Sequence, residues 1–377
     1  MTTHTSSQVK IGHLAVFLAT SGHSGVDRVM KNLLPAMARL GVKVDLLHVN
    51  NHGPHIEPEN NLRVIELGTA HTYSSLPPLI RYLRREKPDV LFSDKDRVNR
   101  IAILAQRFSG TATRVVVRTG TTVSLDLKSR RLFDRFLTRM SMTHLYRWAD
   151  RILLPSMAAV QDFQVITGFP PGHVLAVPSP VATPELYSKA SIRKDNKWLS
   201  SEKTPLIVGI GELSGRKDFS TLIRAFAVVR SDRPVRLIIF GEGKQRAALE
   251  SLIEELGLLG DIDLPGFEPA LYPVLASADL YVHSSRQEGA PVALMEAVAL
   301  GIPCVSTDCP SGSAEILHDG KYGSLVEIGD IKGMADAMVN QLDAPPEREF
   351  IKQAARSFTL DASLNAYMNA FGFVSER

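Results

Sequence analysis

The sequence predicts an α/β protein built from two Rossmann-like domains, each with a doubly wound parallel sheet. Short apolar runs alternate with segments of helical periodicity in both halves of the chain. This alternation is typical of parallel strands that are buried on both faces and joined by crossover helices. The length of 377 residues exceeds what one hydrophobic core usually serves, so two domains are expected.

The first half opens with the apolar run 11–18, a glycine-containing turn, and a helical pattern that ends at Gly41. Glycine suits the left-handed conformation that commonly ends a helix. The short apolar runs that follow, separated by helical patterns, predict the further strands of the sheet. These strands are expected at 42–49, 62–67, 89–93, 114–118 and 151–154.

The second half repeats this pattern after residues 174–182, where Pro178 and Pro180 predict a strand that leads into a rigid hinge. The polar run 188–205 is expected to be a surface loop. We therefore place one domain at 1–180, a second at 181–356 and a C-terminal segment at 357–377. Strands of the second domain are expected at 206–210, 235–240, 279–282 and 303–307, and a terminal helix at 360–373.

Composition limits the class of protein. The chain is 44% hydrophobic and 22% charged, as folded globular proteins are, and its net charge of +3 implies no general attraction to nucleic acid. Cys304 and Cys309 are too few for a disulfide framework. No apolar run reaches the roughly 18 residues of a spanning helix, and no signal peptide is visible. We therefore expect a cytoplasmic protein.

Four strand-to-helix turns have chemistry suited to a ligand, and two of them are characterised by their glycines. Ligands of open α/β sheets bind at the carboxyl ends of strands, beside helix N-termini. The turn 20–28 contains Gly22 and Gly25, which allow backbone amides to approach a ligand closely. A third glycine, Gly241, lies in the turn 240–244. Each of these glycines is also compatible with an ordinary turn.

The turn 211–219 adds charge to this chemistry. It begins with Gly211 and carries Arg216 and Lys217 immediately before a helical pattern. Two cations at a helix N-terminus suit a phosphate or a diphosphate. The alternative is a solvated pair of surface charges.

The segment 283–301 places two carboxylates around a short apolar helix. Glu288 precedes the helix, Pro291 suits its first turn, and Glu296 lies inside it, next to the apolar stripe. A carboxylate at such a position can accept hydrogen bonds from sugar hydroxyls. The alternative is a charge on the helix surface.

Asp94 and Asp96 form an Asp-x-Asp pair after another strand. Such a pair can hold a divalent cation beside substrate phosphates. Lys95 and Arg97 weaken that interpretation, so we expect turn chemistry or an acceptor contact here, and no metal site.

Residues 126–151 are basic and amphipathic. Seven Lys or Arg residues face three acids, with large apolar residues between them. Such a segment can meet an anionic membrane surface. The alternative is a helix that packs its apolar face on the domain core and leaves its arginines in solvent.

These residues together carry a family resemblance. A strand is followed by the motif S-x-x-E-G-x-P, a helix that contains E-A, the motif G-x-P, a second strand and the pair T-D. This order resembles the GT4 family of retaining glycosyltransferases, which have the GT-B fold of two Rossmann-like domains facing across a cleft. The likeness is dense from about residue 209 to 323 and weaker in the N-terminal half. The matching residues are Ser284, Ser285, Glu288, Gly289, Pro291, Glu296, Ala297, Gly301, Pro303, Thr307 and Asp308.

The resemblance implies roles for the site residues. Glu296 would hold the ribose hydroxyls of a nucleotide sugar, Glu288 would contact the transferred sugar, and Lys217, with Arg216, would lie on the diphosphate. The C-terminal helix would return to the N-terminal domain. No metal or other cofactor is implied. The remaining donor-site positions implied by the resemblance are Gly22, Gly25, Gly211, Gly241, Gly289, Ala290 and Pro291.

Three positions depart from the family pattern. Glu212 stands where the family usually has arginine, and Asp218 stands where a glycine is common. The stretch RTGTT that begins at Arg118 contains no histidine, although many members have one nearby. Arg118 or Thr119 is a candidate for the missing contact, and Arg216 for the missing cation.

The expected function is retaining hexosyl transfer from a nucleoside-diphosphate sugar, with UDP-sugars favoured. The acceptor would be a glycan or lipid-linked glycan in cell-surface polysaccharide or glycolipid synthesis, with the enzyme peripheral on the inner membrane face. An epimerase of GT-B fold and a non-catalytic nucleotide-sugar-binding protein remain as alternatives. A dehydrogenase is disfavoured because the turn after the first strand lacks G-x-G-x-x-G.

Overall fold

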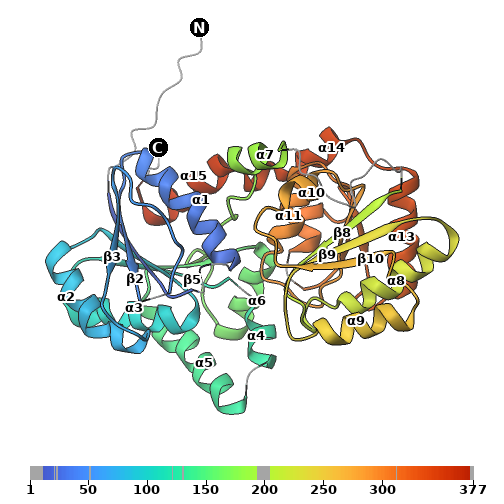
Figure 1. Cartoon of the computed structure of the whole chain (residues 1–377). Helices are drawn as coiled ribbons and strands as arrows, with labels where there is room; N and C mark the ends of the chain where they lie inside the picture. The colour runs from blue at the N-terminus through green and yellow to red at the C-terminus, as the bar shows by residue number, and fades with distance from the viewer. Residues whose placement is uncertain are drawn as a thin grey trace, which may run out of the picture. The chain divides into compact units, whose positions relative to one another are not determined.

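The computed structural model describes residues 12–20, 22, 24–50, 52–120, 122–129, 131–192, 204–310 and 312–373. The chain divides into two compact units. Unit 1 comprises Met1–Pro180 and Leu360–Arg377, and unit 2 comprises Val181–Thr359. Each unit is a parallel sheet covered by helices, as Figure 1 shows. Within the described residues, no helix combines the length and the apolar character needed to span a bilayer.

Unit 1 contains a seven-stranded sheet in which every neighbouring pair is parallel, with strand order β3-β2-β1-β4-β5-β6-β7. The first six positions have the doubly wound order of Rossmann folds. The predicted strands of this half are all present. Their bounds are β1 His13–Leu18, β2 Lys43–His48, β3 Leu62–Glu66, β4 Val90–Asp94, β5 Arg114–Arg118, β6 Arg151–Leu154 and β7 Val174–Ala176.

Helices cover both faces of this sheet. The C-terminal helix belongs to unit 1: the ring centroids of Tyr367 and Phe371 lie 6.1 and 5.4 Å from that of Phe92 in β4. The last helix therefore completes the core of the first unit. The helices are α1 Gly25–Arg39, η1 Tyr73–Ser75, α2 Leu76–Glu86, α3 Asp96–Ser109, α4 Val123–Ser129, α5 Leu132–His144, η2 Leu145–Trp148, α6 Met157–Thr167 and α15 Leu360–Phe371.

Unit 2 contains a six-stranded parallel sheet with order β10-β9-β8-β11-β12-β13. Sequence analysis missed β10 and β13. Pro265 interrupts β10 and is tolerated because β10 is an edge strand. The short β13 lacks a continuous apolar run. The strands are β8 Leu206–Ile210, β9 Arg236–Phe240, β10 Ile262–Gly266, β11 Leu280–His283, β12 Cys304–Thr307 and β13 Ser324–Val326.

The predicted loop 188–205 is wrong at its start, because α7 continues to Ala190. Thr183 caps this helix and Pro184 begins it, a combination that favours helix initiation. Residues 193–203 of the predicted loop lie outside the described residues. The helices of unit 2 are α7 Pro184–Ala190, α8 Phe219–Asp232, α9 Arg246–Glu255, α10 Tyr272–Ala276, α11 Val292–Ala299, α12 Ser313–Leu317, α13 Ile331–Asp343, α14 Arg348–Lys352 and η3 Gln353–Phe358.

Candidate functional site

The candidate site lies where the strand order of unit 2 reverses, between β8 and β11, the position at which open α/β sheets bind ligands. The loops that follow these two strands are joined to each other. Ser284 Oγ donates to the carbonyl oxygen of Lys217 at 2.8 Å, and the amide of Arg286 donates to the carbonyl of Arg216 at 2.8 Å. The two loops therefore form one surface.

Glu288, Lys217 and Arg216 form a charged cluster on this surface. Lys217 Nζ lies 2.5 Å from Glu288 Oε1, and Arg216 Nη1 lies 3.4 Å from Glu288 Oε2. Ser285 Oγ donates to Oε1 at 2.9 Å. Burial would raise the pKa of Glu288, but Lys217, with His283 and Arg216, outweighs burial and brings the pKa to about 2. At neutral pH the cluster is a carboxylate with two cations.

His283, the last residue of β11, lies next to this carboxylate and was missed by sequence reasoning. Its side chain is 2% exposed, Nε2 is 3.7 Å from Glu288 Oε1, and Nδ1 is 3.3 Å from the Tyr281 hydroxyl. Burial, together with the positive charge of Lys217, lowers the pKa of His283 to about 3. The imidazole is therefore neutral beside the ion pair. Its position two residues before the S-x-x-E pattern of Ser285 and Glu288 is a signal that the sequence contained.

We expect His283 to make the protein less stable as the pH falls below neutrality. An unfolded histidine binds a proton near pH 6.5, whereas folded His283 resists protonation down to about pH 3. Stability is therefore lost across this window as the pH falls. His283→Leu should lose on the order of 2 kcal/mol less stability between pH 7 and pH 4.5 than the wild type. Urea unfolding at both pH values measures the difference, and equal losses would contradict it.

Glu296 lies inside α11 and is 1% exposed, so the alternative of a surface charge is wrong. Its Oε1 accepts a hydrogen bond from the hydroxyl of Tyr272 in α10 at 2.9 Å. Tyr272 was not foreseen, because nothing in the sequence links it to a residue 24 positions away. The structure thus orients this carboxylate from a second helix.

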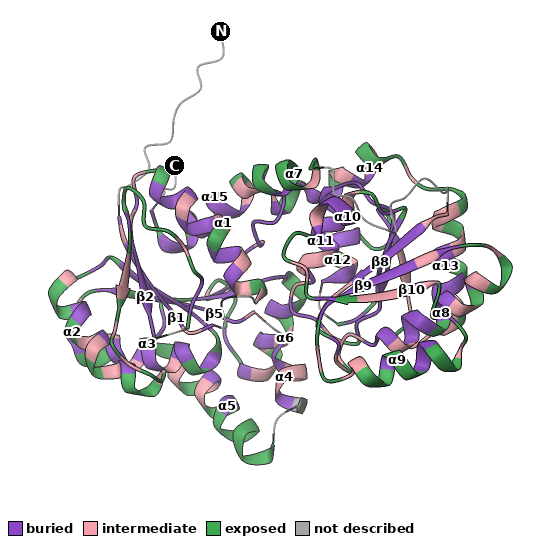
Figure 2. Ribbon diagram, viewed as in Figure 1, coloured by how far each residue is buried: buried purple, intermediate pink, exposed green. Residues whose placement is uncertain are grey.

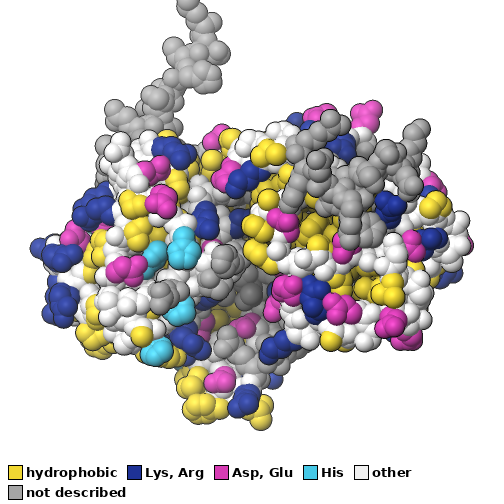
Figure 3. Space-filling view, in the orientation of Figure 1, with side chains coloured by type: hydrophobic (Ala, Val, Ile, Leu, Met, Phe, Trp, Pro, Cys, Tyr) yellow, Lys and Arg dark blue, Asp and Glu magenta, His cyan; other side chains and the backbone are white. Residues whose placement is uncertain are grey.

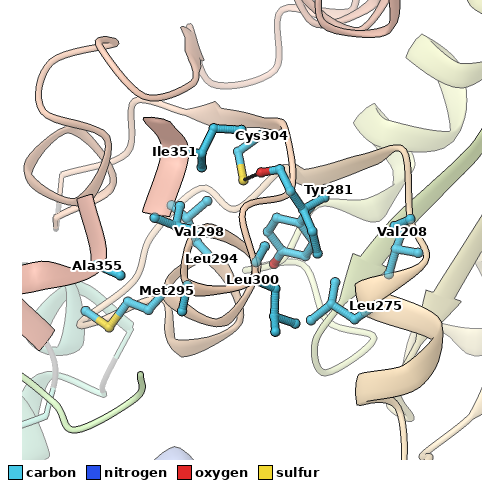
Figure 4. Close-up of a cluster of buried hydrophobic side chains, with 14 of the residues drawn as sticks. Val208, Leu275, Tyr281, Leu294, Met295, Val298, Leu300, Cys304, Ile351 and Ala355 are labelled. Atoms are coloured by element: carbon cyan, nitrogen blue, oxygen red, sulfur yellow. Dashed lines mark hydrogen bonds between the residues drawn. The ribbon is translucent and has the colours of Figure 1, made fainter. Parts of the chain in front are cut away.

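The helix α11 is buried on more sides than the single apolar stripe that the sequence predicts. Every residue from Leu294 to Leu300 is buried, and Figure 4 shows Leu294, Met295 and Val298 among side chains of neighbouring elements. Pro291 is the N-cap of this helix rather than part of its first turn. Gly289, Ala290 and Pro291 form the connection from Glu288 to the helix. A rigidly packed helix holds Glu296 in place relative to this loop.

The glycines after β8 and β9 allow two loops to pack backbone against backbone. A Cβ on Gly241 would lie 1.8 Å from the carbonyl oxygen of Gly211, and one on Gly243 would lie 2.3 Å from that of Leu213. The amide of Leu213 donates to the carbonyl of Glu242 at 2.9 Å. A Cβ on Gly211 would also meet Lys217 Cε at 2.7 Å. These glycines therefore shape the loop that carries Lys217.

Asp218 stands where a glycine is common in the family that the sequence resembles. Its backbone conformation is one that glycine adopts more easily than other residues. Its φ is +48°, in the left-handed region, which aspartate tolerates better than most residues. Its carboxylate accepts hydrogen bonds from Ser220 and Thr221, both at 2.8 Å, and pairs with Arg286 at 2.8 Å. The side chain thus ties the first turn of α8 to the loop of Glu288.

Asp218→Ala should destabilise the protein more than Asp218→Gly. Both changes remove the carboxylate contacts, but alanine also has to adopt the left-handed backbone, which costs about 1–2 kcal/mol for a residue with a Cβ. We expect the two variants to differ in unfolding free energy by about 1 kcal/mol. Urea unfolding measures this difference, and alanine being equal to or better than glycine would contradict it.

Arg216 lies between two carboxylates. In addition to Glu288, its Nη2 is 3.9 Å from Oε2 of Glu212, whose side chain is mostly exposed. Glu212, which stands where the family usually has arginine, is therefore next to Arg216, the candidate for the missing cation.

In unit 1, Gly22 has a φ of +82° and Gly25 begins α1. The N-terminus of α1 is closed by a capping box: Ser24 accepts from the amide of Asp27, and the Asp27 carboxylate accepts from the amide of Ser24 at 2.7 Å. Thr20 also donates to Asp27. Sequence reasoning noted the glycines and missed Asp27, although S-x-x-D is a recognisable cap.

Asp94, Asp96 and Arg118 are occupied by partners within unit 1. Arg118 is 3% exposed and pairs with the fully buried Asp94 at 2.5 Å. Asp96 accepts from Arg100 and from Tyr146. These contacts bury Arg118, the candidate for a substrate contact, against Asp94 within unit 1. In the part of the chain that the structure describes, no three His, Cys, Asp or Glu side chains are grouped to hold a metal ion.

Two Rossmann-like units of this kind, with a cationic loop and two buried glutamates at the switch point of the second, define the class of GT-B proteins. Family models agree with this class. Residues 24–180 match the glycosyl transferase 4-like domain, and residues 191–358 match the glycosyl transferases group 1. The two matches together span most of the chain. The chain therefore belongs to the group 1 glycosyltransferases and is a glycosyltransferase.

Relatives and solved structures agree with this assignment. The chain is 27% identical over 360 residues to a Campylobacter jejuni N-acetylgalactosaminyltransferase that acts on a diphospho-undecaprenol-linked sugar, covering 91% of this chain and 94% of that protein. It is 28% identical to the lipopolysaccharide core glycosyltransferase LpsE of Rhizobium meliloti, covering 83% and 84%. The fold matches HepE of Anabaena, solved with UDP, with a TM-score of 0.74 and 15% identity over 96% of this chain and 99% of HepE.

Proposed function

We propose that the protein transfers a hexosyl group from a UDP-sugar to a glycan or lipid-linked glycan with retention of the anomeric configuration. The observation that carries this proposal is the cluster of Glu288, Lys217 and Arg216 at the switch point of unit 2, with Glu296 on the neighbouring helix. A diphosphate needs cations, and a ribose and a hexose need hydrogen-bond acceptors. The site offers both kinds of group. HepE, which has the same fold, has been solved with UDP and with UDP-glucose.

In this proposal the donor replaces contacts that the protein now makes with itself. Lys217 and Arg216, which pair with Glu288, would turn to the diphosphate oxygens, and Glu288 would then accept from the sugar hydroxyls. Glu296 would accept from the ribose hydroxyls while Tyr272 holds its carboxylate. The ion pairs keep both cations beside the position that the diphosphate would take, so little rearrangement is needed.

The bond changes follow from this arrangement. The bond between the anomeric carbon and the diphosphate oxygen breaks, and negative charge develops on the leaving phosphate. Fixed cations stabilise that charge, and the ionised Glu288 favours positive charge on the sugar ring. The acceptor hydroxyl attacks the same face, and its proton passes to the leaving phosphate oxygen. We propose that Lys217 and Arg216 supply the positive charge without a metal ion.

The proposed acceptor is a lipid-linked glycan, and the process is the synthesis of a cell-surface polysaccharide or glycolipid. The support comes from the relatives. The Campylobacter jejuni enzyme acts on a sugar carried by diphospho-undecaprenol, and LpsE is named for lipopolysaccharide core biosynthesis. We place the enzyme in the cytoplasm, on the inner membrane face.

The test is a thermal-shift screen against nucleoside-diphosphate sugars, followed by transfer assays in EDTA. A ligand at 100 times its dissociation constant adds roughly 2.7 kcal/mol of stability, which is easily measured. We expect a UDP-sugar to stabilise the protein and NMR of the product to show the anomer of the donor. An inverted product would refute retention. Binding without turnover across acceptors would favour a non-catalytic protein, and epimerised free donor would favour an epimerase.

A further inference from the structure

The helix α5 exposes its large apolar side chains to solvent. Leu132 is 83% exposed, Phe133 71% and Phe136 60%, and Leu137 and Met140 are also exposed. Figure 2 shows α5 largely in the colour of exposed residues, and Figure 3 shows hydrophobic and basic side chains together at the lower edge, where Figure 1 places α5. A set of neighbouring apolar residues on a monomer surface marks an interaction site.

The apolar face of α5 points away from the body of unit 1. At about 100° per residue, the five exposed apolar residues lie within an arc of about 140°. Thr138 and Met142, the buried residues of this helix, lie on the opposite side. Thr138 also accepts from Arg100 of α3 at 3.2 Å. The alternative from sequence analysis, in which the apolar face packs on the core, is therefore wrong.

Only part of the basic segment 126–151 is exposed in the structure and can contact a partner. Of the range 126–151, Leu127, Met142 and Tyr146 are buried, so the segment does not act as one continuous surface. The outward part is α5 with the end of η2. We call its exposed arginines and large apolar residues the α5 surface, which consists of Arg131, Leu132, Phe133, Arg135, Phe136, Leu137, Arg139, Met140, Arg147 and Trp148.

The exposed charge around the α5 surface is mostly positive. Residues 131–148 contain four arginines, all exposed, and a single acid, Asp134. Arg135 and Arg139 flank one edge of the apolar arc. Trp148, half exposed, lies under the guanidinium of Arg107, whose carbon is 5.5 Å from the ring centroid. Exposed phenylalanines and leucines with arginines at the side and a tryptophan at the end are the chemistry of a helix lying in a lipid interface.

We propose that the α5 surface docks on an anionic lipid bilayer, with the apolar side chains among the acyl chains and the arginines at the phosphate level. A second copy of this chain is a poorer occupant, because a two-fold contact would bring the same arginines of both copies together. An acidic membrane complements both parts of the surface. The choice of lipid over another partner also rests on the proposed lipid-linked acceptor.

The test is flotation of the full chain with vesicles that contain no acceptor, so that its outcome does not depend on transfer. We compare vesicles of phosphatidylcholine with vesicles containing phosphatidylglycerol. The wild type should float with the anionic vesicles only. Phe133→Ser with Phe136→Ser should abolish flotation, and Arg135→Glu with Arg139→Glu should lower the partition coefficient by about 30-fold or more.

Matched control variants carry the same kinds of substitution at exposed residues outside the α5 surface. Phe108→Ser with Val165→Ser removes two exposed apolar side chains of unit 1, and Arg81→Glu with Arg224→Glu changes the net charge equally. Both controls should float as the wild type does, and all variants should keep the wild-type melting temperature.

The proposal would be overturned if the wild type failed to float. It would also be overturned if both sets of α5 variants still floated. A dimer that forms without lipid and that the α5 changes dissociate, together with no flotation, would show that a second copy covers this surface instead. Transfer to a water-soluble acceptor should persist in the phenylalanine variant. Loss of flotation with preserved transfer therefore separates this surface from the proposed catalytic site.

Discussion

Replacing Lys217 by methionine should lower the rate of transfer by about 10²–10³-fold, the usual effect of removing one fixed group that stabilises developing charge. Methionine preserves the length of the side chain and removes its charge. Lys217 Nζ lies 2.5 Å from Glu288 Oε1, and Ser284 donates to the backbone carbonyl of Lys217, so the residue is placed in the site before any donor arrives. Steady-state assays with a saturating UDP-sugar measure the effect.

Stability has to be separated from catalysis in this variant. Without Lys217, burial raises the pKa of Glu288 from its present value of about 2. A lowered carboxyl pKa contributes stability that is present above the ordinary value of 4.5 and is lost as the pH falls toward 2. Lys217→Met should therefore be less stable than the wild type at neutral pH, and urea unfolding measures this loss.

A double variant distinguishes the two effects. Lys217→Met with Glu288→Gln leaves no uncompensated buried charge, so its stability should recover while transfer remains low. Lys244→Met, a matched change in the loop after β9, should leave transfer near the wild-type level. Wild-type transfer by Lys217→Met would remove Lys217 from the proposed site.

Replacing Glu296 by glutamine should weaken binding of the nucleotide sugar by about 10–100-fold, since hydrogen bonds to a charged group are each worth about 1.5–3 kcal/mol. Glutamine retains the shape of the side chain, and its oxygen can still accept from Tyr272. It offers one acceptor oxygen where the carboxylate offers two. Isothermal titration with a UDP-sugar measures the affinity without requiring an acceptor.

Tyr272→Phe is the matched control for this prediction. It removes the hydroxyl that donates to Glu296 at 2.9 Å and leaves the carboxylate in place. We expect a weakening of a few-fold, smaller than that of Glu296→Gln, because the loss is one orienting hydrogen bond. Unchanged affinity in Glu296→Gln would contradict the assignment of Glu296 to the donor.

The strands show where sequence reasoning was strong. β5, β6 and β8 have the predicted bounds, because a parallel strand buried on both faces is a continuous apolar run that flanking polar residues delimit. β10 was missed for the complementary reason. As an edge strand it is partly exposed and can accommodate Pro265, so its sequence lacks that signal.

Sequence analysis predicted which residues belong to the candidate site, but it did not predict which of them contact each other. Arg216 and Glu288 stand 72 positions apart, and no local pattern reports that they approach to 3.4 Å. Tyr272 was missed for the same reason, since its proximity to Glu296 depends on how α10 packs. Arg118 shows the converse: a charged residue at a strand end looked available to substrate, but its partner Asp94 lies on the neighbouring strand.

The two parallel-sheet domains and the charged loops could be predicted from the amino-acid sequence, because both depend on local apolar periodicity and on residue type. The contacts of Lys217 and Arg216 with Glu288, and the exposure of the apolar face of α5, became visible in the folded protein. Periodicity shows that a helix has an apolar face. Which face meets the rest of the protein depends on side chains from distant parts of the chain, such as Arg100 at Thr138.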